Sequence, residues 1–549
     1  MAGLRGRFVL LDFWTFCCVN CLHVLEELRP LEEKYAEELV IVGVHSPKFV
    51  HEADPDALVA AVERYGVRHP VLDDPELITW QAYTARAWPT LVLVDPEGYL
   101  VAQYAGEGHA HAIDALLTEL VEEHRAKGTL QAGDSPYVAP PVEPTRLRFP
   151  AAAAPLDGGH VLVTDAGHDR VVQLDPDGEE VRAWDGFREP NGLCVVGSTA
   201  YVADTVHHQL KGIDLESGVV TVLAGTGDQW MQGDSTDHLS SPWDVAWWHD
   251  RVWIAMAGIH QLWTFDPTTG RTEVAAGTTN EGLLDGPLEE AWFAQTSGLA
   301  AAGDRLWLVD PETSSLRYVE DGAVHTVAGQ GLFDFGFRDG SGSEALLQHP
   351  LGVCVLPDGS VIVCDTYNGA IRRYEPATGE VTTLASGLAE PSAAYVDRDQ
   401  LVVVESAAHR LTRVPLGHAS RTDGFSHTTQ RPVTEVAAEL DLVIAFTPPP
   451  GQKVDDRFGP PSQLVVEATP PALLRDGGGR GTDLARRIVL DQAVGEGVLH
   501  VAARAASCDE DGGEGAACYI HQQDWGVPIR IVATGEATLA LPLVGAAAD

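Results

Sequence analysis

Positive charge is scarce in this sequence of 549 residues, which has 36 lysines and arginines against 80 aspartates and glutamates. The formal net charge is −44 at neutral pH. A nucleic-acid backbone or an anionic membrane surface binds to clustered positive charge. The composition therefore predicts a soluble chain without a nucleic-acid or membrane partner.

Targeting segments and long hydrophobic runs are also missing. Only residues 1–7 precede the apolar run Phe8–Trp14, too few for the basic and apolar regions of a signal peptide. No run approaches the ~18 apolar residues of a membrane-spanning helix. We therefore expect a cytoplasmic protein, provided that the start site does not lie upstream of the given Met1.

Cysteine is rare, with eight residues in 549, too few for a disulfide framework. Any cysteine chemistry must therefore come from local arrangement. Cys194, Cys354 and Cys364 lie in apolar strand-like runs and are expected in the core. The other five form an N-terminal group and a C-terminal pair: Cys17, Cys18 and Cys21, and Cys508 and Cys518.

The N-terminal group has the spacing of a redox pair. Cys18 and Cys21 lie between the strand-like run Phe8–Trp14 and a helical pattern over Leu22–Leu39. Cys18 is thus expected at a helix N-terminus, where free amides and the helix dipole favour a thiolate, with Cys21 one turn deeper. The alternatives are two buried structural cysteines or half a zinc site with His23, but a second ligand pair is lacking nearby. We expect no metal and no other cofactor.

Residues 1–125 resemble the thioredoxin superfamily. The resemblance rests on Asp12-Phe13-Trp14 before the cysteines and on Arg86–Asp95, which is similar to the family's cis-proline loop and the strand after it. It implies that Cys18 attacks, that Cys21 resolves and that Asp12 takes the proton of Cys21. It also implies that Pro89 packs against the disulfide and that Trp88 offers backbone to substrates.

Three features depart from the familiar pattern. Val19-Asn20 separates the cysteines where familiar reductases have Gly-Pro, so the redox potential does not transfer. Cys17 replaces the usual tryptophan and is expected to be an exposed thiol that either contacts substrate or is merely tolerated. The insertion-bearing segment over residues 40–87 resembles redoxins, which include peroxidases, but Leu11 stands where the peroxidase motif has proline.

Residues 148–415 contain six copies of a strand-rich unit at spacings of roughly 40–55 residues, which is typical of a β-propeller. The openings Pro190–Leu193 and Pro350–Val353 and the stretch Asp365–Arg372 resemble NHL repeats. In five of the six units the second strand ends in an acid, whereas in the third unit it ends in Met256. We interpret these acids as structural rather than as a cation site. The sixth unit lacks a fourth strand, and we expect Arg146–Phe149 to pair with it and close the ring.

After residue 431 the repeats stop, and short alternating strands predict a β-sandwich. Cys508 and Cys518 flank an acidic, glycine-rich loop and can form a disulfide across a hairpin, but in a reducing cytoplasm free thiols are expected. This domain resembles the C-terminal β-domain of thioredoxin-plus-propeller proteins. That resemblance makes the two cysteines a possible secondary redox pair.

The whole order resembles the family of NHL-repeat-containing protein two. We predict a redoxin domain over residues 1–127, a linker over 128–145, a six-bladed propeller over 146–425 and a β-sandwich over 432–549. The expected activity is thiol–disulfide oxidoreduction on a protein client, with an unidentified thiol reductant. The alternatives are a protein-binding scaffold whose redoxin domain is vestigial or a sensor, and a thiol peroxidase.

Overall fold

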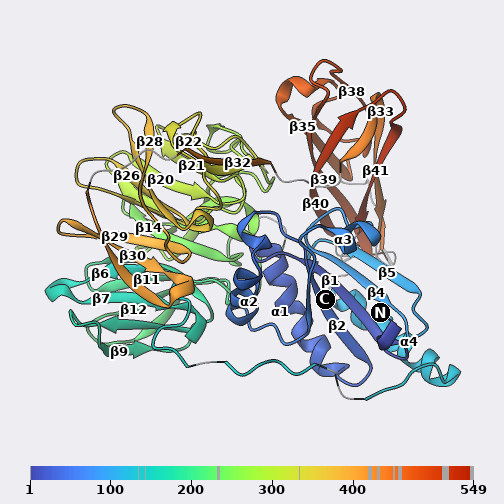
Figure 1. Ribbon diagram of the computed structural model, residues 1–549, viewed down its shortest axis with the longest axis horizontal. Coiled ribbons are helices and arrows are strands. Elements are labelled where there is room, and N and C mark those ends of the chain that lie inside the picture. The colour runs from blue at the N-terminus through green and yellow to red at the C-terminus, as the bar shows by residue number, and fades with distance from the viewer. Residues whose placement is uncertain are drawn as a thin grey trace. The chain divides into compact units, whose positions relative to one another are not determined.

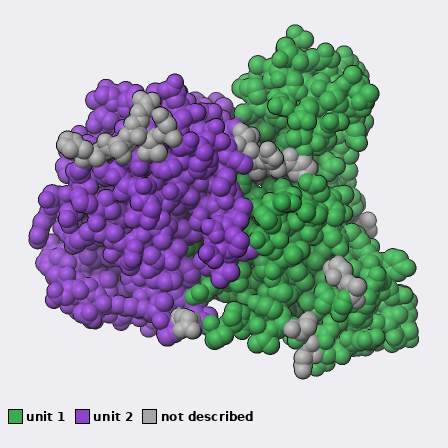
Figure 2. Space-filling model, in the orientation of Figure 1, with its two compact units in different colours: residues 1–48, 61–141, 430–549 green, residues 49–60, 142–429 purple. Residues whose placement is uncertain are grey.

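The structure is a computed structural model of the chain. It describes residues 2–133, 135, 137–142, 144–231, 235–332, 334–417, 423–428, 433–448, 452–454, 460–509 and 518–544. These residues form two compact units (Figure 2). The first unit comprises residues 1–48, 61–141 and 430–549, and the second comprises 49–60 and 142–429. Residues 49–60, which lie inside the predicted redoxin domain, thus belong to the propeller unit.

The N-terminal part of the first unit has a thioredoxin-like fold built on a five-stranded sheet of order β3-β2-β1-β4-β5 (Figure 1). Strands β1, β2 and β3 run parallel, whereas β4 and β5 are antiparallel to their neighbours. The elements are β1 (Phe8–Trp14), α1 (Val19–Lys34), β2 (Leu39–His45), α2 (Pro55–Arg64), β3 (Val71–Asp73), α3 (Ile78–Ala82), β4 (Thr90–Val94), β5 (Leu100–Ala105) and α4 (Ala110–Lys127).

Strand β1 is buried along its whole length, which explains its nearly continuous apolar sequence. Successive side chains point to opposite faces of a sheet. Phe8 and Leu10 pack on the face covered by α1 and α4, whereas Val9, Leu11 and Phe13 pack on the face that carries Trp80 of α3. The period of two therefore sends Asp12, like Leu10, toward the face of α1.

The propeller consists of six sheets, each with its strands in sequential antiparallel order. Blade one contains β6 (Ala153–Pro155), β7 (Val161–Asp165), β8 (Arg170–Leu174) and β9 (Glu180–Trp184). Blade two contains β10 (Pro190–Val196), β11 (Thr199–Asp204), β12 (Gln209–Asp214) and β13 (Val220–Ala224). Blade three contains β14 (Pro242–Trp248), β15 (Arg251–Met256), β16 (Gln261–Asp266) and β17 (Arg271–Ala276).

The last three blades vary in strand number. Blade four contains β19 (Leu299–Ala302), β20 (Arg305–Asp310), β21 (Ser315–Glu320) and β22 (Ala323–Ala328), with β18 (Gly286–Pro287) at its edge. Blade five contains β25 (Gly352–Val355), β26 (Val361–Asp365), β27 (Ala370–Glu375) and β28 (Glu380–Ser386), with β24 (Gly340–Ser341) at its edge. Blade six contains β29 (Pro391–Asp397), β30 (Gln400–Glu405) and β31 (Arg410–Pro415). A separate ribbon pairs β23 (Asp334–Arg338) with β32 (Asp423–Thr428).

The acids that end the second strands are buried and neutralised from their own blade. In blade five, Asp365 accepts from the amide of Gln348 at 2.7 Å and pairs with Arg372 at 2.6 Å. The other four acids accept an equivalent amide and a basic partner: Asp165 with Arg170, Asp204 with Lys211, Asp310 with Arg317, and Glu405 with Arg410. These contacts match a structural role, since a buried charge must be paired.

Blade three has an apolar pair where its neighbours have an ion pair. Met256 occupies the position of the acid, and Trp263 lies seven residues later, where Lys211, Arg317 and Arg372 stand in blades two, four and five. Both side chains are buried in one apolar cluster. The replacement of both partners together leaves no unpaired buried charge in this blade.

A second repeated contact links consecutive blades. Asp169, His208, His260, Ser314 and His409 follow the second strands in the left-handed backbone region, and each accepts an amide hydrogen bond from the next blade. The donors are Glu189, Ser241, Gln295, His349 and Phe149. We call these contacts the interblade hydrogen bonds.

The ring closes through this contact, so the expected strand pairing of Arg146–Phe149 is wrong. Residues 146–149 form bends, and blade six has three strands among the described residues. Phe149 donates its amide to Nδ1 of His409 at 3.0 Å, and β6 of blade one packs beside β29 of blade six. The hydroxyl of Ser392 also donates to the carbonyl of Ala151 at 2.7 Å.

The junction between blades five and six is an exception. Gly369 occupies the accepting position there, at φ +56°, and a Cβ atom would lie 2.5 Å from the carbonyl oxygen of Leu388. Glu390, at the donor position, instead pairs through its side chain with Nε2 of His51 at 2.9 Å. Phe49 packs nearby against the rings of Phe335, His349 and Tyr367. The junction that lacks the interblade hydrogen bond thus holds the segment around residues 49–51.

The C-terminal domain is rich in strands, as predicted. Its ladders join into one continuous hydrogen-bonded network around an apolar core that includes Leu442, Val466, Leu499 and Trp525. The strands are β33 (Thr434–Thr447), β34 (Gln452–Val454), β35 (Ser462–Thr469), β36 (Leu474–Asp476), β37 (Gly479–Gly481), β38 (Ala485–Leu490), β39 (Glu496–Asp509), β40 (Cys518–Ile531) and β41 (Glu536–Val544). Among the described residues, none of the helices is both long enough and apolar enough to cross a membrane.

Candidate functional site

Cys18 is the N-cap residue of α1. Its extended backbone turns the chain from the loop after β1 into the helix, and its Sγ accepts a hydrogen bond from the amide of Cys21 at 3.3 Å. Cys18 and Cys21 are free thiols. The amide and the positive end of the helix stabilise negative charge on the Cys18 sulfur.

Cys21 lies one turn deeper and is fully buried. Burial raises the pKa of its thiol well above the usual value, and the hydrogen bond and charge of Cys18 raise it further, whereas Lys48 and the Thr15 backbone lower it. The two sulfurs therefore have different environments. The Cys18 sulfur accepts an amide hydrogen bond at the helix N-terminus, whereas the pKa of the buried Cys21 thiol is raised.

Asp12 lies in the middle of β1 and is fully buried. Neither of its carboxyl oxygens has a hydrogen-bond partner among the described residues. Burial and, to a smaller extent, the charge of Glu27 together raise the pKa of Asp12 to about 8. At neutral pH this acid holds a proton that an exposed aspartate would have lost.

Glu27 belongs to a group of acids that the sequence did not single out. Its carboxylate accepts the amide of Gly108 at 2.9 and 3.2 Å, in the turn before α4. Burial and the charge of Glu107 raise the pKa of Glu27 to about 7, opposed by the Gly108 amide and His23. Glu107 in turn contacts Nδ1 of His23 through Oε2 at 2.5 Å. We call Asp12, Glu27, Glu107 and His23 the buried acid cluster.

Trp88 and Pro89 lie in the loop before β4, and the peptide bond between them is cis. Nε1 of Trp88 donates to the carbonyl of Ser46 at 2.8 Å, and its ring packs at a tilt of 30° against the ring of Trp80, with the centroids 4.2 Å apart. The ammonium of Lys48 lies 5.4 Å from the centre of the Trp88 ring. These contacts fix the Trp88 side chain beside the loop that follows β2.

Two cysteine expectations are corrected by the structure. Cys17 was expected to be an exposed thiol, but its side chain is only 3% exposed. Cys508 was expected to be a free thiol, yet it is disulfide-bonded, and the backbone register sets Cys518 directly opposite it. The side chain of Cys518 and the loop 510–517 lie outside the described residues. Cys194, Cys354 and Cys364 lie in β10, β25 and β26, and burial raises the pKa of all three.

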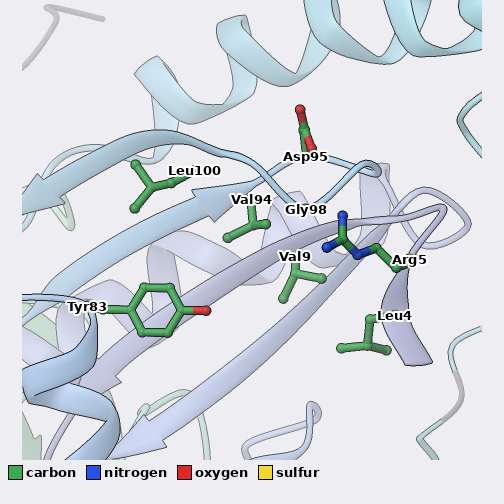
Figure 3. A pocket seen from close by; sticks show the side chains of 8 residues that line it. All are labelled: Leu4, Arg5, Val9, Tyr83, Val94, Asp95, Gly98 and Leu100. Atoms are coloured by element: carbon green, nitrogen blue, oxygen red, sulfur yellow. The ribbon is translucent and has the colours of Figure 1, made fainter. Parts of the chain in front are cut away.

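A small hollow of about 120 Å³ lies on the other face of the sheet. Figure 3 shows Val9 and Val94 on neighbouring strands between Tyr83 and Arg5. Val9 points away from the face of Asp12, so the hollow is separate from the buried acid cluster. Close to it, Asp95, Glu97 and His124 bring three potential metal ligands within 4.8 Å of one another, but Nδ1 of His124 already bonds Thr129 at 2.7 Å.

Comparisons with known proteins agree with the fold. A thioredoxin-like family model matches residues 6–100, and an NHL repeat model matches residues 347–374. The chain is 36% identical over 426 residues to the Arabidopsis thaliana Protein SUPPRESSOR OF QUENCHING 1, chloroplastic, covering 70% of this chain and 40% of that protein. It is 34% identical over 440 residues to human NHL repeat-containing protein 2, covering 70% of this chain and 60% of that protein.

The thioredoxin-like region has bacterial relatives of its own. Over 106 residues it is 28% identical to thiol-disulfide oxidoreductase ResA of Halalkalibacterium halodurans, covering 19% of this chain and 56% of that protein. A solved virginiamycin B lyase from Staphylococcus aureus matches with a TM-score of 0.35 at 12% identity, over 52% of this chain and 85% of that one, too low to carry an argument. The chain thus joins a thioredoxin-like domain to an NHL-repeat propeller and is similar to NHL repeat-containing protein 2, of which it spans about 60%.

Proposed function

We propose that the thioredoxin-like domain is a thiol–disulfide oxidoreductase in which Cys18 attacks and Cys21 resolves. The observation that carries the proposal is the hydrogen bond from the Cys21 amide to Cys18 Sγ at the start of α1. A sulfur that accepts an amide at a helix N-terminus is prepared to carry negative charge. The similarity to a named thiol-disulfide oxidoreductase supports the same activity.

The reaction has two exchange steps. The Cys18 thiolate attacks one sulfur of a client disulfide, that disulfide breaks, and the second client sulfur leaves as a thiolate. Cys21 then gives its proton to Asp12 in the ionised form of that carboxyl and attacks Cys18 Sγ, which releases the first client sulfur as a thiolate. Two electrons pass from the dithiol to the client, and Cys18 and Cys21 become a disulfide. An external dithiol must reduce this disulfide before the next turnover.

The client is proposed to be a protein, with the propeller and the C-terminal domain as interaction modules. We propose a cytoplasmic location for this reaction. The disulfide at Cys508 argues against this location, since reducing compartments disfavour structural disulfides. Localisation of the tagged full-length chain, together with the oxidation state of Cys508 in the same cells, tests the compartment.

Reduction of insulin disulfides by the full chain, with dithiothreitol as reductant, tests the proposed activity. We expect Cys18→Ser and Cys21→Ser to abolish catalysed reduction. The matched control is Cys17→Ser, which removes a neighbouring thiol and should leave the rate unchanged. Peroxide consumption that needs Cys18 without insulin reduction would support the peroxidase alternative instead.

A second candidate is a protein-binding propeller scaffold whose redoxin domain is vestigial or a sensor. It is favoured by the burial of Cys18, which is only 5% exposed and therefore poorly accessible to a bulky client. This candidate predicts that full-length Cys21→Ser captures no client through Cys18. A captured client that is released by dithiothreitol would support the oxidoreductase.

A further inference from the structure

The buried acid cluster places a second carboxyl behind the redox pair. Asp12 points from β1 toward α1, and Glu27 lies on α1 between the buried residues Val24 and Leu28. Glu27 is held there by the Gly108 amide, which donates to both of its oxygens. Two carboxyl groups in one poorly solvated site oppose each other's ionisation.

We infer that Glu27 is a positioning residue for Asp12, and that the two acids share one negative charge so that the proton leaving Cys21 is taken up by the pair. The inference rests on the proposed oxidoreductase function. It adds a residue that acts on the proton acceptor and not on the sulfurs. Glu27 does so by setting how readily Asp12 ionises.

The hydrogen bonds of the two acids support a shared charge that lies mainly on Glu27. Asp12 has no hydrogen bond among the described residues that would stabilise its ionised form. Glu27 has such a bond from Gly108, so the negative charge of the pair is better accommodated on Glu27 while Asp12 keeps the proton. The raised pKa values of both groups agree with a pair that is not fully ionised at neutral pH.

The buried acid cluster also offers the proton released by Cys21 a path to solvent. The charge of Glu107 acts on Glu27 and raises its pKa. The Glu107 side chain is 19% exposed, whereas Asp12 is fully buried. His23 contacts Glu107 from α1. Other charged or titratable groups that face the site are Lys48 near Cys21, Cys18 itself, and His109, whose pKa burial lowers. Glu27 and Glu107 are both half-buried, so the cluster reaches solvent through these two acids, whereas Asp12 does not reach it directly.

The direct test measures the ionisation of Asp12 in the dithiol form of the full chain, by carboxyl infrared or ¹³C NMR titration, with Asp12→Asn identifying the signal. In Glu27→Gln, which keeps an acceptor for the Gly108 amide, we expect the Asp12 midpoint to fall by about one pH unit. Glu33→Gln is the matched control, because it removes a charge from the exposed face of the same helix, where the Glu33 side chain is 75% exposed. It should leave the midpoint unchanged.

A kinetic test follows the same coupling through the reaction. The Cys18 thiol is converted to a mixed disulfide with thionitrobenzoate, and its release by Cys21 is followed against pH. Glu27→Gln should shift the half-maximal rate to lower pH by a similar amount, because Asp12 becomes a base at lower pH. Glu27→Asp keeps the charge and should restore the profile of the parent protein.

The outcomes separate the two proposals. An Asp12 midpoint that is equal in the parent protein, Glu27→Gln and Glu33→Gln overturns the role of Glu27. Absence of thionitrobenzoate release in every protein overturns the oxidoreductase function, while a shifted Asp12 midpoint in Glu27→Gln would still establish the shared charge.

Discussion

The backbone amide of Cys21 donates a hydrogen bond to Sγ of Cys18 at 3.3 Å, which joins the two cysteines across the first turn of α1. The donor belongs to the first turn of α1, and the same amide also donates to the carbonyl of Cys18 at 3.0 Å. The same turn buries the Cys21 thiol completely. The geometry therefore assigns different chemistry to two residues of the same type.

This difference predicts unequal alkylation of the two thiols. At pH 7.5, iodoacetamide should modify Cys18 in the Cys21→Ser variant at least roughly tenfold faster than Cys21 in the Cys18→Ser variant, since the raised pKa of Cys21 leaves little thiolate. Mass spectrometry of the quenched time course measures both rates. Equal rates would contradict the assignment of Cys18 as the attacking thiol.

The buried Asp12 predicts a pH dependence of stability. Its pKa rises from 3.8 to about 8 on folding, so the folded state keeps a proton that the unfolded state has lost between these values. Stability from this group is therefore lost as the pH rises from about 4 to about 8. In Asp12→Asn, the decrease in unfolding free energy between pH 5 and pH 8 should shrink by about 2 to 4 kcal/mol.

Urea unfolding of the full chain at the two pH values measures this change. Glu33→Gln is again the control, because it removes a carboxyl from the exposed face of α1 and should leave the pH dependence of stability unaltered. A pH dependence that is the same in Asp12→Asn and the parent protein would show that Asp12 titrates normally in the fold.

The ion pairs of the blades predict strong coupling between their members. Lys211→Trp should destabilise blade two by about 3 kcal/mol, because the buried Asp204 loses its lysine partner. The double variant Asp204→Met/Lys211→Trp copies the pair of blade three and should cost less than the sum of its single substitutions. Thermal or urea unfolding of the three variants completes the cycle. Additive costs would argue against the pairing as the reason for the exception in blade three.

The ring closure predicts that His409 contributes to the stability of the propeller although it lies in a turn. His409→Gly keeps the left-handed backbone accessible but removes the acceptor of the Phe149 amide, at an expected cost of about 1 kcal/mol. The melting temperature of the full chain measures the loss. His260→Gly, at an internal junction, is the comparison. No destabilisation in either variant would contradict a stabilising role for the interblade hydrogen bonds.

The fold could be predicted from the sequence where the same type of residue recurs in the same structural role. Strands that end in a buried acid mark the second strand of five blades, and the exception at Met256 still fits because the apolar strand pattern continues through it. The order of strand, cysteine turn and helix likewise indicated the position of Cys18. In both cases the local spacing is sufficient, because the partners lie within a few residues of one another.

Long-range contacts were less readable. The interblade acceptors are aspartate, histidine and serine, which share a backbone conformation and not a side-chain chemistry, so the closure through His409 left no repeated motif. In sequence, Glu27 looks like the half-buried Glu26 and the exposed Glu33 of the same acid-rich helix. Only the approach of the Gly108 turn and the opposite Asp12 sets it apart.

The central claim is that Cys18 and Cys21 exchange electrons with a protein disulfide, and catalysed reduction of insulin by the full chain tests it most directly. We predict turnover with dithiothreitol in the parent protein and in Cys17→Ser, and none above the uncatalysed rate in Cys18→Ser or Cys21→Ser. Turnover that survives in Cys18→Ser, or a parent protein no faster than dithiothreitol alone, would contradict the account.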